Sequence, residues 1–310
     1  MKKVIYFICA IVIILLIIFT KNIFSNEKKK TMFNNPILPE GFKKVETQHA
    51  SWKIENGIPK GWNDGLVIED SNDNQFVWVP VDVGINHDNK DVNQIYVKEQ
   101  LDMNELEDLQ IYKYGGFYVS RFEAGVSLDM QNELNNIDES KNDIIDIPQS
   151  KSNIRPWNYI SLKNAKLSAE KMYNTEFLKS GLLTNKQWNS ILNWIEYEES
   201  GKIGNYSNVN FGFTGLYSID DGKNYQYAEQ KSKSQYNMIL SSGATERNMT
   251  KNIYDLAGNL AEYTGQYIKN MGYVIRGGNY DNIDNYSVSS TMIGTKADNK
   301  FGFRVVLYIK

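Results

Sequence analysis

Cysteine is nearly absent from this chain of 310 residues, and the single one, Cys9, lies in an apolar run near the N-terminus. The body of the protein therefore has no disulfide, no cysteine-ligated zinc or iron–sulfur cluster and no thiol nucleophile. Histidine is almost as rare, with only His49 and His87, and no H-E-x-x-H motif occurs. Because a catalytic zinc usually takes several histidines, we do not expect a zinc enzyme.

Basic residues are also too few, outside the N-terminus, to favour nucleic acid. The chain carries 34 Lys and Arg against 37 Asp and Glu, a net charge of −3. Residues 1–30 hold six lysines and one glutamate, so residues 31–310 carry 28 basic and 36 acidic side chains, a balance of −8. Nucleic-acid binding relies on Lys and Arg against phosphate, so we expect no nucleic-acid partner.

Aromatic residues, by contrast, are plentiful. The chain has 20 Tyr, 13 Phe and 6 Trp, and hydrophobic residues make up 41% of it. This composition excludes a wholly disordered chain, and the 23% of charged residues excludes a polytopic membrane protein. A chain of this length can bury a sizeable core, which we expect to contain many flat aromatic side chains.

The first 30 residues are typical of an export or anchoring signal. An unbroken apolar run over residues 4–20 follows Lys2 and Lys3. As a helix it would span about 25 Å, slightly less than a hydrocarbon core of roughly 30 Å, and Lys3 and Lys21 can reach the two interfaces. No A-x-A-like cleavage site follows it, which favours an uncleaved single-pass anchor in the cell membrane; cleavage and secretion are the alternative.

The body is expected on the extracytoplasmic side. Lys28–Lys30 follow the apolar run, against the positive-inside rule, but long C-terminal domains translocate largely regardless of charge. We divide the chain into a membrane anchor or signal segment over residues 1–30, a polar tether with three prolines over 31–59, and one domain over 60–310.

Hydrophobic patterning predicts an α+β domain rich in loops. Strands are expected at 76–81, 116–123, 273–276 and 303–308, and helices at 161–172 and from 184 onward. Ser161 and Thr184 are the expected N-caps, because their hydroxyls can accept hydrogen bonds from the first turn. From residue 200 onward Gly, Asn, Tyr and Ser dominate, which is typical of long ordered loops.

Three segments toward the C-terminus carry recognisable motifs. They are residues 252–264, NIYDLAGNLAEYT, residues 274–280, VIRGGNY, and residues 302–305, GFRV. In this order they resemble the G-L-Y-D-M-x-G-N-V-W-E-W-T, V-x-R-G-G-S-W and G-F-R-[VC] blocks of the formylglycine-generating enzyme (sulfatase-modifying factor) family. Upstream, residues 76–80, 117–123, 182–188 and, more loosely, 243–248 follow in the order typical of the family and its bacterial members. The resemblance covers residues 60–310 and implies a divergent C-type-lectin-like fold.

The cysteines of the oxidising members are missing, however. Those members bind copper through two cysteines between the R-G-G block and the final strand, and the corresponding residues 281–301 include none. A serine or threonine cannot replace a thiolate for a soft metal and oxygen activation. Ala261 and Tyr263 also stand where the family has tryptophans. We therefore reject formylglycine-generating activity, and two early histidines do not match the iron site of the sulfoxide-synthase relatives.

What the resemblance implies instead is a structural calcium site. Carried over position by position, the ligands would be the side chains of Asp255 and Glu262 and the backbone carbonyls of Gly258 and Leu260. Calcium takes roughly six to eight hard oxygens, which a tight loop can supply in part. The alternative is that Asp255 caps a turn and Glu262 is solvated.

These features favour a non-catalytic, membrane-anchored binding module for a protein or glycan ligand, with no catalytic residues. The aromatic-rich stretch 188–236 could present the ligand surface, although Trp188 and Trp194 are expected in the core. We expect Glu123 to stabilise the fold and Arg276 to partner a buried carboxylate or carbonyl. The alternatives are a metal-dependent oxidoreductase or protein-modifying enzyme of the same family with a non-cysteine site, and a purely structural envelope protein.

Overall fold

The computed structural model describes residues 36–310 except 56, 82–101, 103–104, 127–129, 131–143, 201–216, 220–224, 228–238, 245, 281–290 and 295. Residues 36–310 group into one folded unit. The apolar run expected to cross the membrane, residues 4–20, lies outside the described part. Among the helices that the structure describes, none is long and apolar enough to span a bilayer.

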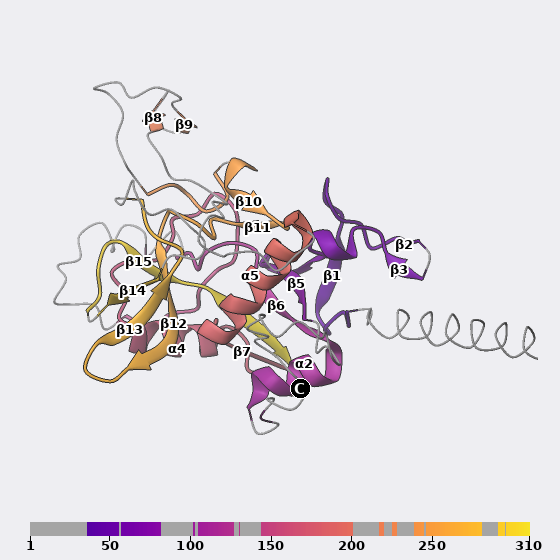
Figure 1. The fold of residues 1–310 in the computed structure, drawn as a ribbon, viewed down its shortest axis with the longest axis horizontal. Helices are drawn as coiled ribbons and strands as arrows, with labels where there is room; N and C mark the ends of the chain where they lie inside the picture. Colours follow the sequence, from indigo (N-terminus) through magenta and orange to yellow (C-terminus); the bar gives the residue numbers. More distant parts are fainter. Residues whose placement is uncertain are drawn as a thin grey trace, which may run out of the picture. The chain divides into compact units, whose positions relative to one another are not determined.

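A six-stranded antiparallel sheet forms the centre of this unit (Figure 1). Its strands, in spatial order, are β1 (Phe42–Val45), β4 (Val67–Asp70), β5 (Gln75–Pro80), β6 (Gly116–Ser120), β16 (Val305–Ile309) and β7 (Leu178–Leu182). The C-terminal strand β16 pairs with β6 on one side and β7 on the other. The end of the chain therefore completes the sheet and leaves β7 at its edge.

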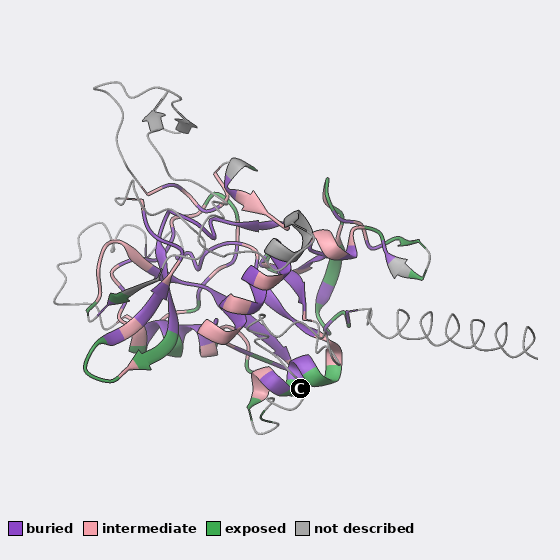
Figure 2. Ribbon diagram, in the orientation of Figure 1, coloured by how far each residue is buried: buried purple, intermediate pink, exposed green. Residues whose placement is uncertain are grey.

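Side chains alternate between two cores, one on each face of the sheet. On β5, Phe76 and Trp78 belong to the first core, and Val77 and Val79 belong to the second. This alternation is the two-residue period of a strand that is buried on both faces. Figure 2 shows buried residues along these strands and exposed residues at the turn of the β12–β13 hairpin.

Three described α-helices cover the sheet. Helix α4 (Leu162–Met172) packs against β7 and buries Ala165 and Ala169 in the first core. Helix α5 (Asn185–Ser200) supplies Trp188 and Ile191 to the second core, and α2 (Leu106–Tyr114) supplies Ile111. Burying an aliphatic or aromatic side chain of this size stabilises the fold by roughly 1.5–3 kcal/mol.

A second sheet has four strands, in the order β14 (Thr291–Gly294), β13 (Gly272–Arg276), β12 (Ala261–Ile268) and β15 (Phe301–Phe303). Strands β12 and β15 are parallel. Three two-stranded ribbons are formed by β2 (Ile54–Glu55) with β3 (Ile58–Pro59), β8 (Tyr217–Ile219) with β9 (Tyr225–Tyr227), and β10 (Met249–Thr250) with β11 (Ile253–Tyr254). Short 3-10 helices occur at Trp62–Asp64 and Glu246–Asn248.

The α+β prediction and both predicted helix starts are confirmed. The Ser161 hydroxyl accepts a hydrogen bond from the Asn164 amide at 3.3 Å, and that of Thr184 accepts one from the Gln187 amide at 3.1 Å. The strand expected at 303–308 is divided in two. Phe303 ends β15 in the second sheet, β16 begins at Val305 in the first, and one residue, Arg304, lies between them.

The predicted tether over residues 31–59 needs correction, because residues 36–59 belong to the folded unit. Strand β1 extends the main sheet, with Phe42 opposite Asp70. Trp52 is buried and its Nε1 donates to the Val67 carbonyl at 2.8 Å. The polar composition was misleading because β1 is an edge strand, on which Lys43 and Lys44 are exposed.

Candidate functional site

Three sequence blocks that resemble family motifs meet at the start of β12. Glu262 lies opposite Arg276 on β13 and opposite Gly302 on β15. The Gly258 amide, in the loop before β12, donates to the Gly277 carbonyl at 2.8 Å. The three blocks, residues 252–264, 274–280 and 302–305, are therefore parts of one structural unit. Tyr254 and Arg304, for example, are hydrogen-bonded although they lie 50 positions apart in the sequence.

Close packing explains two glycines of these blocks. At Gly277, with φ at 90°, an added Cβ would lie 2.7 Å from the Leu256 carbonyl oxygen. At Gly302 it would lie 2.8 Å from Leu260 Cδ1. Both contacts are shorter than a carbon atom tolerates. At Gly277 the contacted atom belongs to the backbone, so a larger residue would push the two blocks apart, whereas at Gly302 the Leu260 side chain would have to move.

The loop from Asp255 to Ala261 has an unusual backbone. Asp255, Gly258 and Asn259 have φ values of 57°, 89° and 50°, in the left-handed region. The two oxygens of the Asp255 carboxyl group accept hydrogen bonds from the Gly243 amide and from Asn248 Nδ2, both at 3.0 Å. Burial raises the pKa of Asp255. Hydrogen bonds from both sides thus hold the first carboxyl group of the loop.

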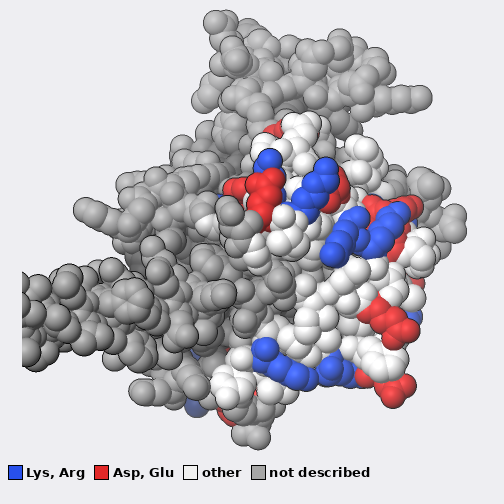
Figure 3. Space-filling model, turned by 90° about the vertical axis from the view of Figure 1, so that its right-hand side faces the viewer, with Lys and Arg blue, Asp and Glu red and all other residues white. Residues whose placement is uncertain are grey.

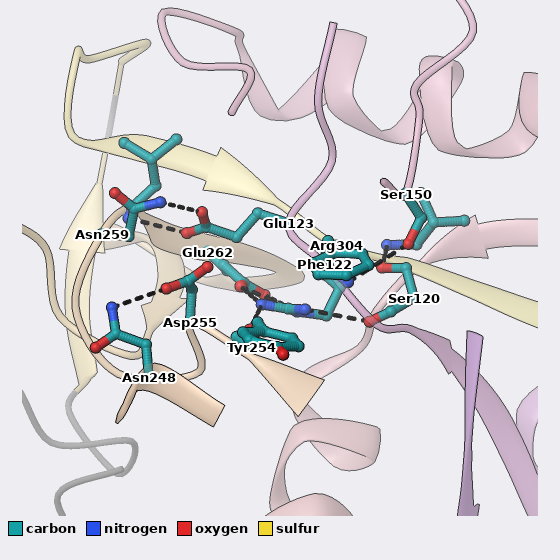
Figure 4. Close-up of polar contacts among 12 residues, drawn as sticks. Ser120, Phe122, Glu123, Ser150, Asn248, Tyr254, Asp255, Asn259, Glu262 and Arg304 are labelled. Carbon is teal, nitrogen blue, oxygen red and sulfur yellow. Dashed lines mark hydrogen bonds and ion pairs between the residues drawn. The ribbon is translucent and has the colours of Figure 1, made fainter. Parts of the chain in front are cut away.

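Glu262 forms a buried ion pair with Arg304 (Figure 4). Arg304 Nη2 lies 2.6 Å from Glu262 Oε1, and Nε lies 3.1 Å from both carboxylate oxygens. The guanidinium also donates to the carbonyls of Ser120 at 3.1 Å and Tyr254 at 2.8 Å. Burial alone would lower the pKa of Arg304, but the charge of Glu262 and its hydrogen bonds outweigh this and raise it.

Glu123 is the third carboxyl group of this cluster. Its oxygens accept hydrogen bonds from Asn259 Nδ2 and from the Leu260 amide, the latter at 2.9 Å. Burial, together with the nearby charges of Asp255 and Glu262, raises the pKa of Glu123 well above its ordinary value. Three buried carboxyl groups therefore share the charge of one guanidinium, and this geometry fits the structural role expected of Glu123.

The four predicted calcium ligands lie in and beside this loop, and the side chains of Asp255 and Glu262 are buried, so Glu262 is not solvated. Carboxylate and carbonyl oxygens are the donors that calcium takes. Both oxygens of Glu262, however, contact the Arg304 guanidinium, which would repel a neighbouring cation. This arrangement does not fit a calcium ion at Glu262, and the described residues include no group of three or more His, Cys, Asp or Glu that could hold a metal. Calcium binding stays a prediction of the resemblance.

A second feature is an open cleft of about 580 Å³ at the edge of the main sheet. It lies among the starts of α2 and α5, the exposed side of α4, strand β7 and residues Thr264–Gln266 of β12. Its charged lining comprises Glu105, Glu107, Glu170, Lys166, Lys179 and Lys186. Three charges of each sign thus surround the cleft.

Hydrogen bonds fix one wall of the cleft. Thr184 and Gln187 form a capping box at the start of α5, in which the Thr184 amide donates to Gln187 Oε1 and the Gln187 amide donates to Thr184 Oγ1, both at 3.1 Å. Thr184 Oγ1 also donates to Glu107 Oε2 at 2.6 Å, and burial raises the pKa of Glu107. Lys186 pairs with Asp108. The starts of α2 and α5 are thereby held together.

Other described surface mixes charges of both signs. On the face shown in Figure 3, Lys and Arg side chains lie beside Asp and Glu. Lys43 pairs with Glu69 at 2.7 Å, and Lys60 pairs with Glu55 at 3.6 Å. Both lysines are exposed, and ion pairs at the surface typically contribute less than about 1 kcal/mol each to stability.

The ligand surface expected at 188–236 lies mostly outside the described residues. Trp188 and Trp194 are buried at 1% and 6% exposure, as expected for core residues. Arg276 Nη2 donates to the side-chain carbonyl oxygen of Asn189 at 3.1 Å, and burial lowers the pKa of Arg276 to about 10. The cleft itself was not foreseen, because its lining comes from six separate elements and only part of it, residues 182 and 184–186 and Thr264, falls in the family-like blocks.

Comparison with known proteins adds no identification. No known family model matches this chain, and no curated protein matches it. The resemblance to the sulfatase-modifying factor family therefore depends on the motifs and on their meeting point described above.

Proposed function

We propose that this protein is a membrane-anchored, extracytoplasmic binding module with a non-catalytic sulfatase-modifying-factor-like domain. The observation that carries the proposal is the open cleft of about 580 Å³ at the edge of the main sheet. Ligand sites are typically clefts of roughly 300–1,000 Å³ on an ordered scaffold. The walls of this cleft are elements of such a scaffold, held by the capping box of α5 and by pairing of β7 with β16.

The family assignment is supported by the three blocks that meet at Glu262 and Arg304. The blocks resemble the family's motifs in sequence, and in the structure their glycines and charged residues also pack against one another. The absence of cysteine from the sequence after Cys9 argues against the copper-dependent oxidation of the family. A scaffold with an open cleft and without these cysteines is suited to binding rather than to oxidation.

Screening the full-length chain in a mild detergent against two kinds of probe tests the proposal. One is an array of cell-envelope glycans and the other is a phage-displayed library of random peptides. We expect saturable binding of at least one kind, with detergent micelles alone as the control. Failure of both, or turnover of a peptide substrate with oxygen consumption, would contradict a non-catalytic binding module.

A further inference from the structure

We infer that the tip of the β12–β13 hairpin, residues 267–273, contacts the surface of the lipid bilayer. This inference rests on the proposed membrane anchoring and adds to it a second, peripheral contact between the folded unit and lipid. The evidence is the exposure of apolar side chains at the tip, the backbone that holds them, the charges around them and the length of chain between the proposed anchor and the fold.

Two large hydrophobic side chains are exposed at the tip. Tyr267 is 59% exposed and Met271 is 58% exposed. Among the large hydrophobic side chains that the structure describes, only Ile54 is exposed to the same degree. Figure 2 shows the turn between β12 and β13 as exposed surface. Exposed apolar groups that lie together often mark a contact with another protein or with a membrane.

Hydrogen bonding and strand pairing hold the tip in an ordered turn. The Met271 amide donates to the Ile268 carbonyl at 3.0 Å, and Asn270 has a φ of 64°, in the left-handed region. Tyr267 pairs with Tyr273 in the register of the hairpin, and their ring centroids lie 5.3 Å apart. The apolar side chains are thus presented on a preformed turn, so little conformational entropy is lost when they are covered.

The residue types at the tip are those of a membrane interface. Tyrosine rings favour the headgroup region, and a lysine can place its stem in apolar surroundings while its ammonium group reaches the phosphates. Lys269 is exposed in the turn, and no acidic residue occurs between Glu262 and Asp281. Residues 31–310 as a whole carry eight more acidic than basic side chains. The tip is therefore a part of an acidic body that anionic lipid would not repel.

The proposed anchor keeps the hairpin close to lipid. The apolar run ends at residue 20 and the folded unit begins at Pro36, so 15 residues link them. Fully extended, such a linker reaches roughly 50 Å. A tether of this length makes lipid contact intramolecular in effect, and a contact too weak to recruit a free protein then suffices. This argument favours lipid over a free partner as the surface that covers the tip.

Lipid quenching of a fluorophore at the tip tests the inference. The full-length chain, in a Cys9→Ser background, is reconstituted into vesicles of phosphatidylcholine and phosphatidylglycerol that carry a nitroxide high on the acyl chain. Met271→Cys carries the fluorophore. Ile54→Cys on the β2–β3 hairpin is the matched control, because Ile54 is equally exposed and is also apolar. We expect an about two-fold loss of emission at position 271, the result of burial at the headgroup boundary, and little loss at 54.

A further variant tests whether the side chains of the tip cause the contact. Tyr267→Ser with Lys269→Glu, added to the labelled Met271→Cys chain, removes an interfacial ring and reverses the charge. We expect it to restore most of the emission, while leaving urea unfolding close to that of its parent, because both side chains are exposed. Unchanged quenching in this variant would contradict a contact made by the tip.

Flotation of the same vesicles on a density gradient separates the inference from the proposed anchoring. A chain that floats without quenching at position 271, or with equal quenching at 54, would overturn the inference and leave the anchoring standing. A chain that does not float would end both. Shielding of the label from aqueous iodide without lipid quenching would place a second copy of the protein on the tip, and would also overturn the inference.

Discussion

At the scale of single residues, Arg304 is the cation around which the acidic side chains of the loop are arranged. Its guanidinium contacts Glu262 and two backbone carbonyls, and it is completely buried. Removing one member of such a pair leaves the other as an unpaired buried charge, which costs far more than the pair contributes to stability.

We predict that Arg304→Met lowers the free energy of unfolding by about 3–5 kcal/mol, because Glu262 is left without its partner. The double variant Arg304→Met with Glu262→Leu is the matched control, since it removes both charges. It should lose less than the single variant. Urea unfolding of all three proteins measures this, and a single-variant loss no larger than that of the double variant would contradict the pairing.

A pH dependence follows from Glu123. Its pKa in the folded protein is raised well above its ordinary value. The folded state therefore holds a proton that the unfolded state releases, so this contribution to stability is full below the ordinary pKa and is lost as the pH rises through the raised value.

Glu123→Gln cannot titrate and should therefore flatten that part of the stability profile. We expect wild-type stability to fall more steeply than that of Glu123→Gln between mildly acidic and neutral pH, with an extra slope of at most about 1.4 kcal/mol per pH unit. Urea unfolding across this pH range checks the difference in slope. Parallel profiles for the two proteins would show that Glu123 is ionised in the fold.

At the scale of elements, the sequence predicted what local chemistry determines. The N-caps Ser161 and Thr184 and the strand at 76–81 could be recognised from neighbouring residues alone. The division of 303–308 at Arg304 could not, because it depends on a carboxylate from β12 that lies 42 positions earlier. Helix α2 was missed since its apolar residues do not follow one face, and only Ile111 among them is buried.

Ser161 provides a test of one wall of the cleft. Its hydroxyl caps α4, which carries Lys166 and Glu170. Ser161→Ala should destabilise the fold by about 1 kcal/mol, because an amide in the first turn loses its acceptor. Ser161→Thr keeps the hydroxyl and should remain close to the wild type in thermal unfolding. Equal losses for the two variants would argue against the cap.

At the scale of the whole molecule, two features could be predicted from the sequence to different degrees. They are the cluster of charged residues formed by Glu123, Asp255, Glu262 and Arg304, and the cleft. The Asp255–Glu262 loop was found because its motif is contiguous, but its partner Arg304 was not assigned to it. The cleft gathers Glu107, Lys166 and Lys179 from separate elements, and only the folded sheet brings them together. Sequence patterns describe a motif within one segment far better than a surface assembled from many.

The claim that this is a binding module and not an oxidase is tested most directly by its metal content. Elemental mass spectrometry of the full-length chain, before and after treatment with a chelator, is the measurement. The account predicts no stoichiometric copper or iron. About one calcium per chain would confirm the calcium prediction and revise the charge balance around Glu262. Stoichiometric copper or iron would contradict the account and restore the oxidoreductase alternative.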